Sequence, residues 1–314
     1  MFHPIPFVLL ATFLGCSHTS DVADPSHAQI VKVHSSPGRD VPQGKRVVLA
    51  GYGKAAAQDY ALGQANVGVT YVNGQSLPPI NAETLALYRK AAEKGGAVEQ
   101  AYLGYLYQNG KGVPQSDSNA VAWYRKAADQ GHAVGQAFLG YMYQRGRGVP
   151  QSDSDAVAWY RKAADQGNVM GQFNLGQMYA NGLGVPQSDS EAVAWFSKAA
   201  DQGHAGAQAL LGFKYRRGKG VPQSDAQAVA WYRKAAEQGH AEGQKGLGWM
   251  YANGLGVPQD AVKAHMWESL ALLNGEATAG ALINELAKKM TPAQLSQAQA
   301  MAQTCRTSNY TTCE

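Results

Sequence analysis

Residues Gly131 to Gly167 read GHAVGQAFLGYMYQRGRGVPQSDSDAVAWYRKAADQG, and this stretch decides the fold. Its pattern returns every 36 residues, and the tryptophans of successive copies are Trp123, Trp159, Trp195, Trp231 and Trp267. Leu-Gly and Gly-Val pairs recur at the same spacing, and a weaker copy with Leu87-Tyr88 in phase precedes them. A fixed period between 20 and 50 residues is typical of a solenoid. We therefore expect six repeats over residues 55–275.

Each repeat predicts two helices. Between residues 133 and 144, Leu139 and Tyr143 belong to an apolar stripe at helical spacing. The following Gly-x-Gly-Val-Pro segment ends that helix, because consecutive glycines and a proline cannot continue it. The second helix begins at Ser-Asp-Ser, where Ser188 and Glu191 have the spacing of a capping box. Its stripe of alanines with Trp-Tyr is expected to face the core, and a glycine ends it.

This pattern resembles the Sel1-like repeat family, whose units are related to the tetratricopeptide repeat and slightly longer. The residues that carry the resemblance are Leu-Gly-x-x-Tyr, Gly-x-Gly-Val-Pro-Gln and Ala-x-x-Trp-Tyr-x-Lys-Ala-Ala, in five close copies. The resemblance implies an all-α fold: a right-handed superhelical solenoid of antiparallel helix pairs.

Residues 276–314 predict a helical cap, because the repeat stops after Gly275. The stretches Ala277–Met290 and Pro292–Gln303 look helical, with Thr291 as the N-cap of the second. A solenoid needs such an element to cover its last apolar face.

The tail holds two cysteines, Cys305 and Cys313, which can close a small loop by a disulfide in an oxidising compartment. A metal site is the alternative, but two thiols without a nearby histidine fall short of the four ligands that zinc prefers.

The N-terminus predicts export. Residues 1–15 carry an apolar stretch of about ten residues, too short to span a bilayer and suited to a signal peptide. The ending Phe-Leu-Gly-Cys resembles a bacterial lipobox, in which Cys16 would receive lipid; an ordinary signal peptide with an incidental cysteine is the alternative. Residues 16–54, rich in Ser, His, Asp, Pro and Gly, are expected to form a lipid-anchored tether. By resemblance to lipoprotein sorting signals, Ser17 favours a periplasmic location on the outer membrane, with secretion as the alternative.

The charge pattern argues against a nucleic-acid-binding protein. The net charge is +4, charged residues make up 16% of the chain, and both signs recur within each repeat. Nucleic-acid-binding proteins instead gather Lys and Arg on one face. The sequence pI near 8.8 is compatible with weak attraction to acidic partners.

No catalytic motif accompanies the repeats. Ser-x-x-Lys, His-Glu-x-x-His and Gly-x-Ser-x-Gly are all missing from the sequence. His132, His204 and His240 share one phase, but neighbouring equivalents lie about 10 Å apart, too far to share a metal ion. We therefore expect surface histidines, no metal, no cofactor and no enzyme.

Positions that differ between repeats predict a partner-binding surface, because packing positions should be alike in every unit. One such column on the first helices holds Tyr105, Tyr141, Gln177, Phe213 and Trp249. A second column, one turn earlier, holds Tyr102, Phe138, Asn174, Leu210 and Gly246. The alternative is that one of the two columns is buried between repeats.

By resemblance to tetratricopeptide relatives, the first helices line a concave groove. Aromatic residues with arginines nearby have the composition of protein-binding hot spots, and the arginines are Arg145, Arg147, Arg216 and Arg217. The sequence therefore predicts a groove for a protein partner, with membrane contact only through the N-terminal lipid.

Within the Sel1-like family, members with a lipoprotein-like signal include periplasmic immunity proteins that neutralise phospholipase-type toxins of the type VI secretion system. The resemblance implies a non-catalytic protein that occludes such a toxin. An envelope scaffold or a secreted host-interaction factor is the alternative, and an enzyme such as a cell-wall hydrolase is disfavoured.

Overall fold

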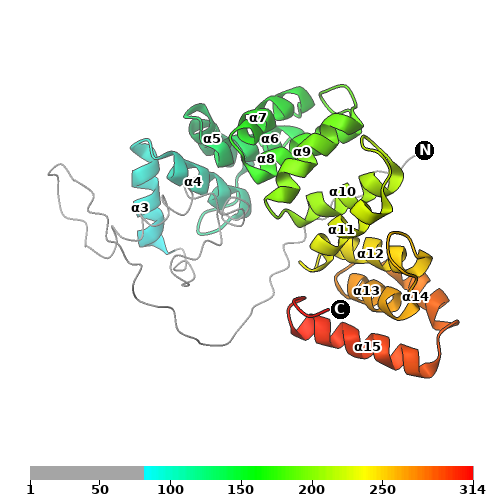
Figure 1. Ribbon diagram of the computed structural model, residues 1–314. Helices are drawn as coiled ribbons and strands as arrows, with labels where there is room; N and C mark the ends of the chain where they lie inside the picture. Colours follow the sequence, from blue (N-terminus) through cyan, green and yellow to red (C-terminus); the bar gives the residue numbers. More distant parts are fainter. Residues whose placement is uncertain (1–80, 314) are drawn as a thin grey trace, which may run out of the picture. The chain divides into compact units, whose positions relative to one another are not determined.

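The computed structural model describes residues 81–313, and every regular element in that part of the chain is a helix. The expected signal peptide, Cys16, the tether and the beginning of the first repeat lie outside the described residues. The helices follow one another in chain order (Figure 1). They are α3 (Ala82–Glu93), α4 (Ala97–Asn109), α5 (Asp117–Asp129), α6 (Ala133–Arg145), α7 (Asp153–Asp165), α8 (Val169–Asn181), α9 (Asp189–Asp201), α10 (Ala205–Arg217), α11 (Asp225–Ala236), α12 (Ala241–Asn253), α13 (Ala261–Leu273), α14 (Ala279–Ala287) and α15 (Pro292–Thr307).

The helices form pairs, as a repeat solenoid requires. The first helices of successive repeats are α4, α6, α8, α10 and α12, and each packs on the second helix that follows it. Each first helix also packs on the second helix of the repeat before it. The predicted all-α solenoid of helix pairs is therefore confirmed.

Local sequence explains where the second helices begin. Ser116, Ser152, Ser188 and Ser224 are N-caps, and the side chain of each accepts a hydrogen bond from the backbone N–H three residues later. At α9 the bond joins Glu191 N to Ser188 Oγ over 3.2 Å. Such a bond satisfies one of the free N–H groups of the first turn. The capping box predicted for Ser188 and Glu191 is present only in its serine half, and complete capping boxes occur at α3 and α15.

The glycine turn between the two helices also contacts the preceding repeat. Gly148 has a φ of +68°, which favours glycine. A Cβ at this position would lie 2.4 Å from the backbone carbonyl of Asp117, at the start of α5. The turn is therefore packed so closely on its neighbour that only a residue without a side chain fits.

The Leu-Gly pair of the first helices makes room for a large side chain, which is an aromatic ring at α4, α6, α8 and α10 and Glu268 at α12. Leu139 is fully buried, and a Cβ on Gly140 would lie 2.8 Å from the ring of Tyr160. The second helix of the same repeat supplies that ring. The core of each repeat therefore depends on a large side chain of the second helix, which occupies the space that the glycine of the first helix leaves free.

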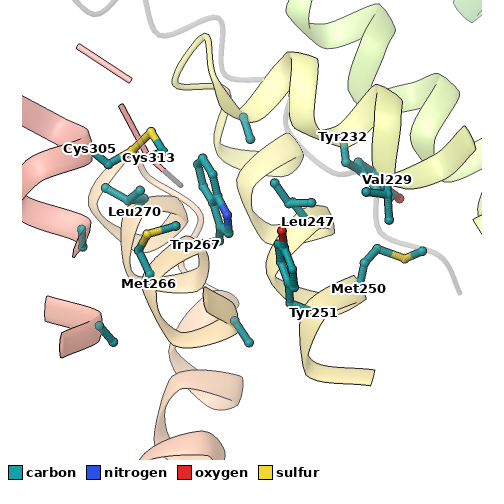
Figure 2. Close-up of a cluster of buried hydrophobic side chains, with 14 of the residues drawn as sticks. Val229, Tyr232, Leu247, Met250, Tyr251, Met266, Trp267, Leu270, Cys305 and Cys313 are labelled. Carbon is teal, nitrogen blue, oxygen red and sulfur yellow. A yellow bond between two sulfur atoms is a disulfide. The ribbon is translucent and has the colours of Figure 1, made fainter. Parts of the chain in front are cut away.

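The C-terminal helices cover the last repeat. Both α14 and α15 pack on α13, and Trp267 of α13 is 1% exposed. Figure 2 shows its indole between Leu247 of α12 and the disulfide that joins Cys305 to Cys313. Relative to the predicted spans, α14 is shorter and α15 runs on to Thr307.

Candidate functional site

The two variable columns of the first helices have different surroundings. We call Tyr105, Tyr141, Gln177, Phe213 and Trp249 the outer column, and Tyr102, Phe138, Asn174, Leu210 and Gly246 the inner column. The residues of the inner column lie against the second helix of the preceding repeat, whereas those of the outer column are more exposed to solvent.

The expectation that Tyr102 is available to a partner is wrong. Tyr102 is 6% exposed, and its ring centre lies 4.6 Å from that of Tyr88 on α3. Phe138, one repeat later, is half-buried and stacks on Tyr124 with ring centres 5.0 Å apart. Both residues face an aromatic ring of the preceding repeat, so packing between repeats occupies their surface.

Other members of the inner column also pack on the preceding repeat. Leu210 packs on the cluster around Phe196. A Cβ on Gly246 would lie 2.4 Å from the Tyr232 ring, so only glycine leaves space for that tyrosine. Asn174 is half-buried. At these positions variation therefore reflects complementary packing, which is the alternative that the sequence left open.

Cations lie close to the aromatic rings of the outer column. Phe213 is 36% exposed and belongs to none of the buried clusters, while Tyr105, Tyr141, Gln177 and Trp249 are half-buried. The ammonium of Lys111 lies 5.0 Å from the centre of the Tyr105 ring and donates a hydrogen bond to its hydroxyl. The guanidinium of Arg145 lies 5.8 Å from the Tyr141 ring. Cations at these distances are attracted by the ring quadrupole.

One arginine joins two repeats on this column. The guanidinium of Arg216 lies 5.5 Å from the Phe213 ring on its own helix and 4.5 Å from the Trp249 ring on α12. Arg217 lies 5.9 Å from the Phe213 ring. We call Phe213, Arg216, Arg217 and Trp249 the arginine–aromatic cluster.

The cations near the outer column differ in their pairing. Arg147 makes a two-pronged ion pair with Asp117, with nitrogen–oxygen distances of 2.7 and 3.0 Å, so it belongs to the packing between repeats. The ammonium of Lys214 pairs with the carboxylate of Asp189. Among residues 81–313, Arg145, Arg216 and Arg217 have no carboxylate partner. These three arginines keep their charge available to a ligand.

The expectation of surface histidines is also wrong. His132, His204 and His240 are the N-caps of α6, α10 and α12. Each Nδ1 accepts a hydrogen bond of 3.1 to 3.3 Å from a backbone N–H in the first turn. Asn168 caps α8 in the same way, which explains why asparagine interrupts this series. Burial lowers the pKa of His132 and of His204 to about 4, so both imidazoles are neutral at pH 7.

A chain of buried amides, which the sequence did not suggest, links the repeats. In each first helix one buried glutamine donates to a carbonyl near the end of the preceding second helix. Its side-chain oxygen accepts a hydrogen bond of 2.7 or 2.8 Å from an amide at the end of the next second helix. The glutamines are Gln100, Gln136, Gln172, Gln208 and Gln244. The sequence signal that could have revealed these glutamines is a polar residue that recurs at the same position of each otherwise apolar first helix.

Residues 81–313 contain no group of three or more His, Cys, Asp or Glu side chains that could hold a metal ion. Within the same residues, no helix combines the length and the apolar character that crossing a bilayer requires.

Comparison with known proteins agrees with the repeat structure. The sequence profile of the Sel1 repeat matches six consecutive segments, 61–96, 100–132, 133–168, 169–204, 205–240 and 241–275. The search of functionally curated proteins returned no match.

Solved structures share the fold. A protective antigen present in uropathogenic Escherichia coli strains, which displays an SLR fold, is 34% identical over 83% of this chain, with a TM-score of 0.65. This chain spans 56% of the length of that antigen. A Sel1 repeat protein from Oxalobacter formigenes is 32% identical over 71% of this chain and 99% of its own, with a TM-score of 0.60.

An immunity protein from Pseudomonas aeruginosa is more distant, at 24% identity over 80% of this chain and 84% of its own, with a TM-score of 0.43. That likeness supports no functional inference. The six matched segments cover more than half of the chain, and their helix pairs are present wherever the structure describes them. The chain therefore belongs to the Sel1 repeat family.

Proposed function

We propose that this protein binds a protein partner on its outer column and catalyses no reaction of its own. The observation that carries the proposal is the position of Arg216, which lies against the rings of both Phe213 and Trp249 without a carboxylate partner among the described residues. Aromatic and arginine side chains are enriched at the energetic centres of protein interfaces. Because repeats stack along one axis, they align such side chains on an extended surface.

The partner that we propose is a phospholipase-type toxin delivered by the type VI secretion system, and the protein is its immunity protein. The support is the resemblance of the repeats to the Sel1-like family together with the signal-like residues 1–15 and Cys16. In this role the outer column covers the catalytic face of the toxin. Inhibition by occlusion requires affinity and shape complementarity, and the inhibitor needs no catalytic group.

The location that we propose is the periplasmic side of the outer membrane, with a lipid on Cys16. The wild-type protein should incorporate labelled palmitate and fractionate with the outer membrane, whereas Cys16→Ser should do neither. A single acyl chain holds a protein to a membrane only weakly, so the several chains of a lipoprotein are expected to be needed. A wild-type protein that takes up no label would exclude the anchor.

The alternative function is an envelope scaffold or a secreted host-interaction factor. One observation favours it: the E. coli relative with 34% identity is described as a protective antigen, and a protective antigen is recognised by the host.

Affinity capture separates the two functions. The chain from residue 17 to residue 314 is immobilised and exposed to the envelope and secreted fractions of its own bacterium, and bound proteins are identified by mass spectrometry. One dominant lipase, inhibited by the purified chain at a one-to-one ratio, is the result expected for an immunity protein. A broad set of envelope proteins with no dominant lipase would favour the alternative.

A further inference from the structure

We infer that the arginine–aromatic cluster recognises an acidic surface of a protein partner. This inference rests on the proposed binding function and names the chemistry of the partner. It follows from how charge is distributed between the first and second helices, from the geometry of Arg216 and from the apolar surface beside it.

Few carboxylates lie on the first helices near this surface, and Glu242, in the first turn of α12, is the one on the helix that carries Trp249. The helices α6, α8 and α10 contain neither Asp nor Glu, and neither does the turn that follows α10. The second helices α5, α7, α9 and α11 all begin with Asp, and the Asp residues are Asp117, Asp153, Asp189 and Asp225. The end of α10 and the turn that follows it therefore carry positive charge with no carboxylate in the same segment.

The cations of the second helices lie against aromatic side chains of their own. Lys126, Lys162 and Lys198 each lie within 4.2 Å of the centre of a tryptophan ring three residues earlier. Arg125 donates a hydrogen bond of 2.6 Å to the hydroxyl of Tyr143. Cations without a carboxylate partner therefore occur on both kinds of helix, and Arg216, Arg217 and Lys219 are three of them within four residues, at the end of α10 and in the turn that follows.

The geometry of Arg216 suits a carboxylate. Its guanidinium is flanked by Phe213 and Trp249, and rings attract the cation without neutralising its charge. The Arg216 side chain also donates a hydrogen bond to the Tyr232 hydroxyl, and its remaining edge N–H groups can donate to the oxygens of a carboxylate. Arg217 is exposed beside it and adds a second positive charge. Both rings also hold the long side chain in place, which lowers the entropy that binding must remove.

The apolar neighbours favour a protein over a nucleic acid. Phe213 offers an exposed ring and Trp249 a half-exposed one, so an acidic residue next to an apolar residue would fill the cluster. Nucleic acids need a longer basic stripe than three unpaired cations, because each phosphate contact contributes little by itself.

Fluorescence anisotropy with the chain from residue 17 to residue 314 tests the inference. The probes are a fluorescein-labelled peptide of alternating Glu and Leu and its matched Gln and Leu peptide. We expect the acidic peptide to bind, to weaken as salt is added, and to bind on the order of tenfold more weakly to Arg216→Gln and to Arg217→Gln. The neutral peptide should bind little, and Arg306→Gln, on the exposed end of α15, should behave as wild type.

Two results would overturn the inference: equal affinity for the acidic and neutral peptides, or unchanged affinity of both arginine variants. Tighter binding of labelled poly-uridine RNA or of phosphatidylglycerol vesicles than of the acidic peptide would also overturn it. Partner capture is measured on the same variants. Capture that survives both arginine substitutions contradicts the acidic-partner inference alone, whereas acidic-peptide binding without any captured protein contradicts the proposed function.

Discussion

At the scale of single residues, the histidine caps make the helix starts sensitive to acid. A neutral Nδ1 accepts the N–H of the first turn in His132, His204 and His240, and a protonated imidazole cannot. Burial lowers all three pKa values below the ordinary 6.5. The unfolded chain therefore binds more protons, and the stabilisation is complete above pH 6.5. For His132 and His204 it is lost as the pH falls from there to about 4.

Substitution of the three histidines by asparagine should remove this acid sensitivity. Asn168 performs the same capping in α8 without titrating, so it is the natural precedent for the change. Urea unfolding at pH 7.5 should give similar stabilities for wild type and variant, while at pH 4.5 the variant should be the more stable. An equal loss of stability in both proteins on acidification would contradict the capping explanation.

Glu268 is a second titrating residue, with the opposite dependence. It occupies the position at which other repeats place an aromatic ring, and it is 1% exposed. One carboxylate oxygen has no hydrogen-bond partner. Burial raises the pKa of Glu268 to about 8, and the nearby Lys245 offsets only part of that effect. The folded state thus prefers the neutral carboxyl, and stability falls as the pH rises from about 4.5 to about 8.

Glu268→Gln should therefore stabilise the protein at pH 8, by roughly 1–3 kcal/mol. Between pH 6.5 and 8.5 the histidines do not contribute, so in that range the wild type should lose stability and the variant should not. Urea unfolding at both pH values measures the difference. Parallel profiles would mean that the carboxylate is solvated in the folded protein.

At the scale of helices, the tryptophan at one position of the repeat is buried to different extents in different repeats. Trp195 is 7% exposed and Trp267 is 1% exposed, whereas Trp123, Trp159 and Trp231 are half-buried. The neighbours of the tryptophan ring differ from repeat to repeat, and Lys198 covers the open side of Trp195. Sequence periodicity alone would treat the five as equivalent.

Trp195→Ala should cost roughly 3–5 kcal/mol, the usual range for removing a buried large aromatic side chain. Trp231→Ala, in the next second helix, is the matched comparison and should cost clearly less, because its ring is already part-exposed. Thermal unfolding followed by circular dichroism measures both. Equal costs would show that local exposure does not govern the contribution of this position.

At the scale of the whole molecule, the residues of the outer column differ in whether they contribute to packing between repeats as well as to the binding surface. Phe213 lies outside the buried clusters, whereas Tyr141 and Trp249 pack against them. Replacing all three by alanine would therefore mix loss of binding with loss of packing. Phe213 offers the cleaner test.

Phe213→Ala should weaken capture of the partner and leave the unfolding free energy within about 0.5 kcal/mol of wild type. Phe173→Ala is the control: its ring packs on Phe196 and on His204, so the substitution should lower stability and leave capture intact. Capture by mass spectrometry and urea unfolding are measured on both variants. If Phe213→Ala unfolds the protein or captures as well as wild type, the outer column is not the binding surface.

The sequence by itself determined the repeat, its period and where most helices begin and end. Those features depend on local chemistry: serine caps, glycine turns with positive φ, prolines, and apolar stripes within one helix. The Thr291 capping box that starts α15 is of the same kind, because all of its atoms belong to neighbouring residues.

Only the tertiary structure decided which variable residues face solvent, because that depends on contacts between repeats. Tyr102 and Tyr105 lie on one helix, yet the ring of Tyr88 on α3 covers the first and leaves the second part-exposed. Arg145 and Arg147 are nearly adjacent, and an aspartate thirty residues earlier neutralises one of them. Such partners meet only when repeats stack, so a pattern read along one repeat cannot distinguish a packing residue from a binding residue.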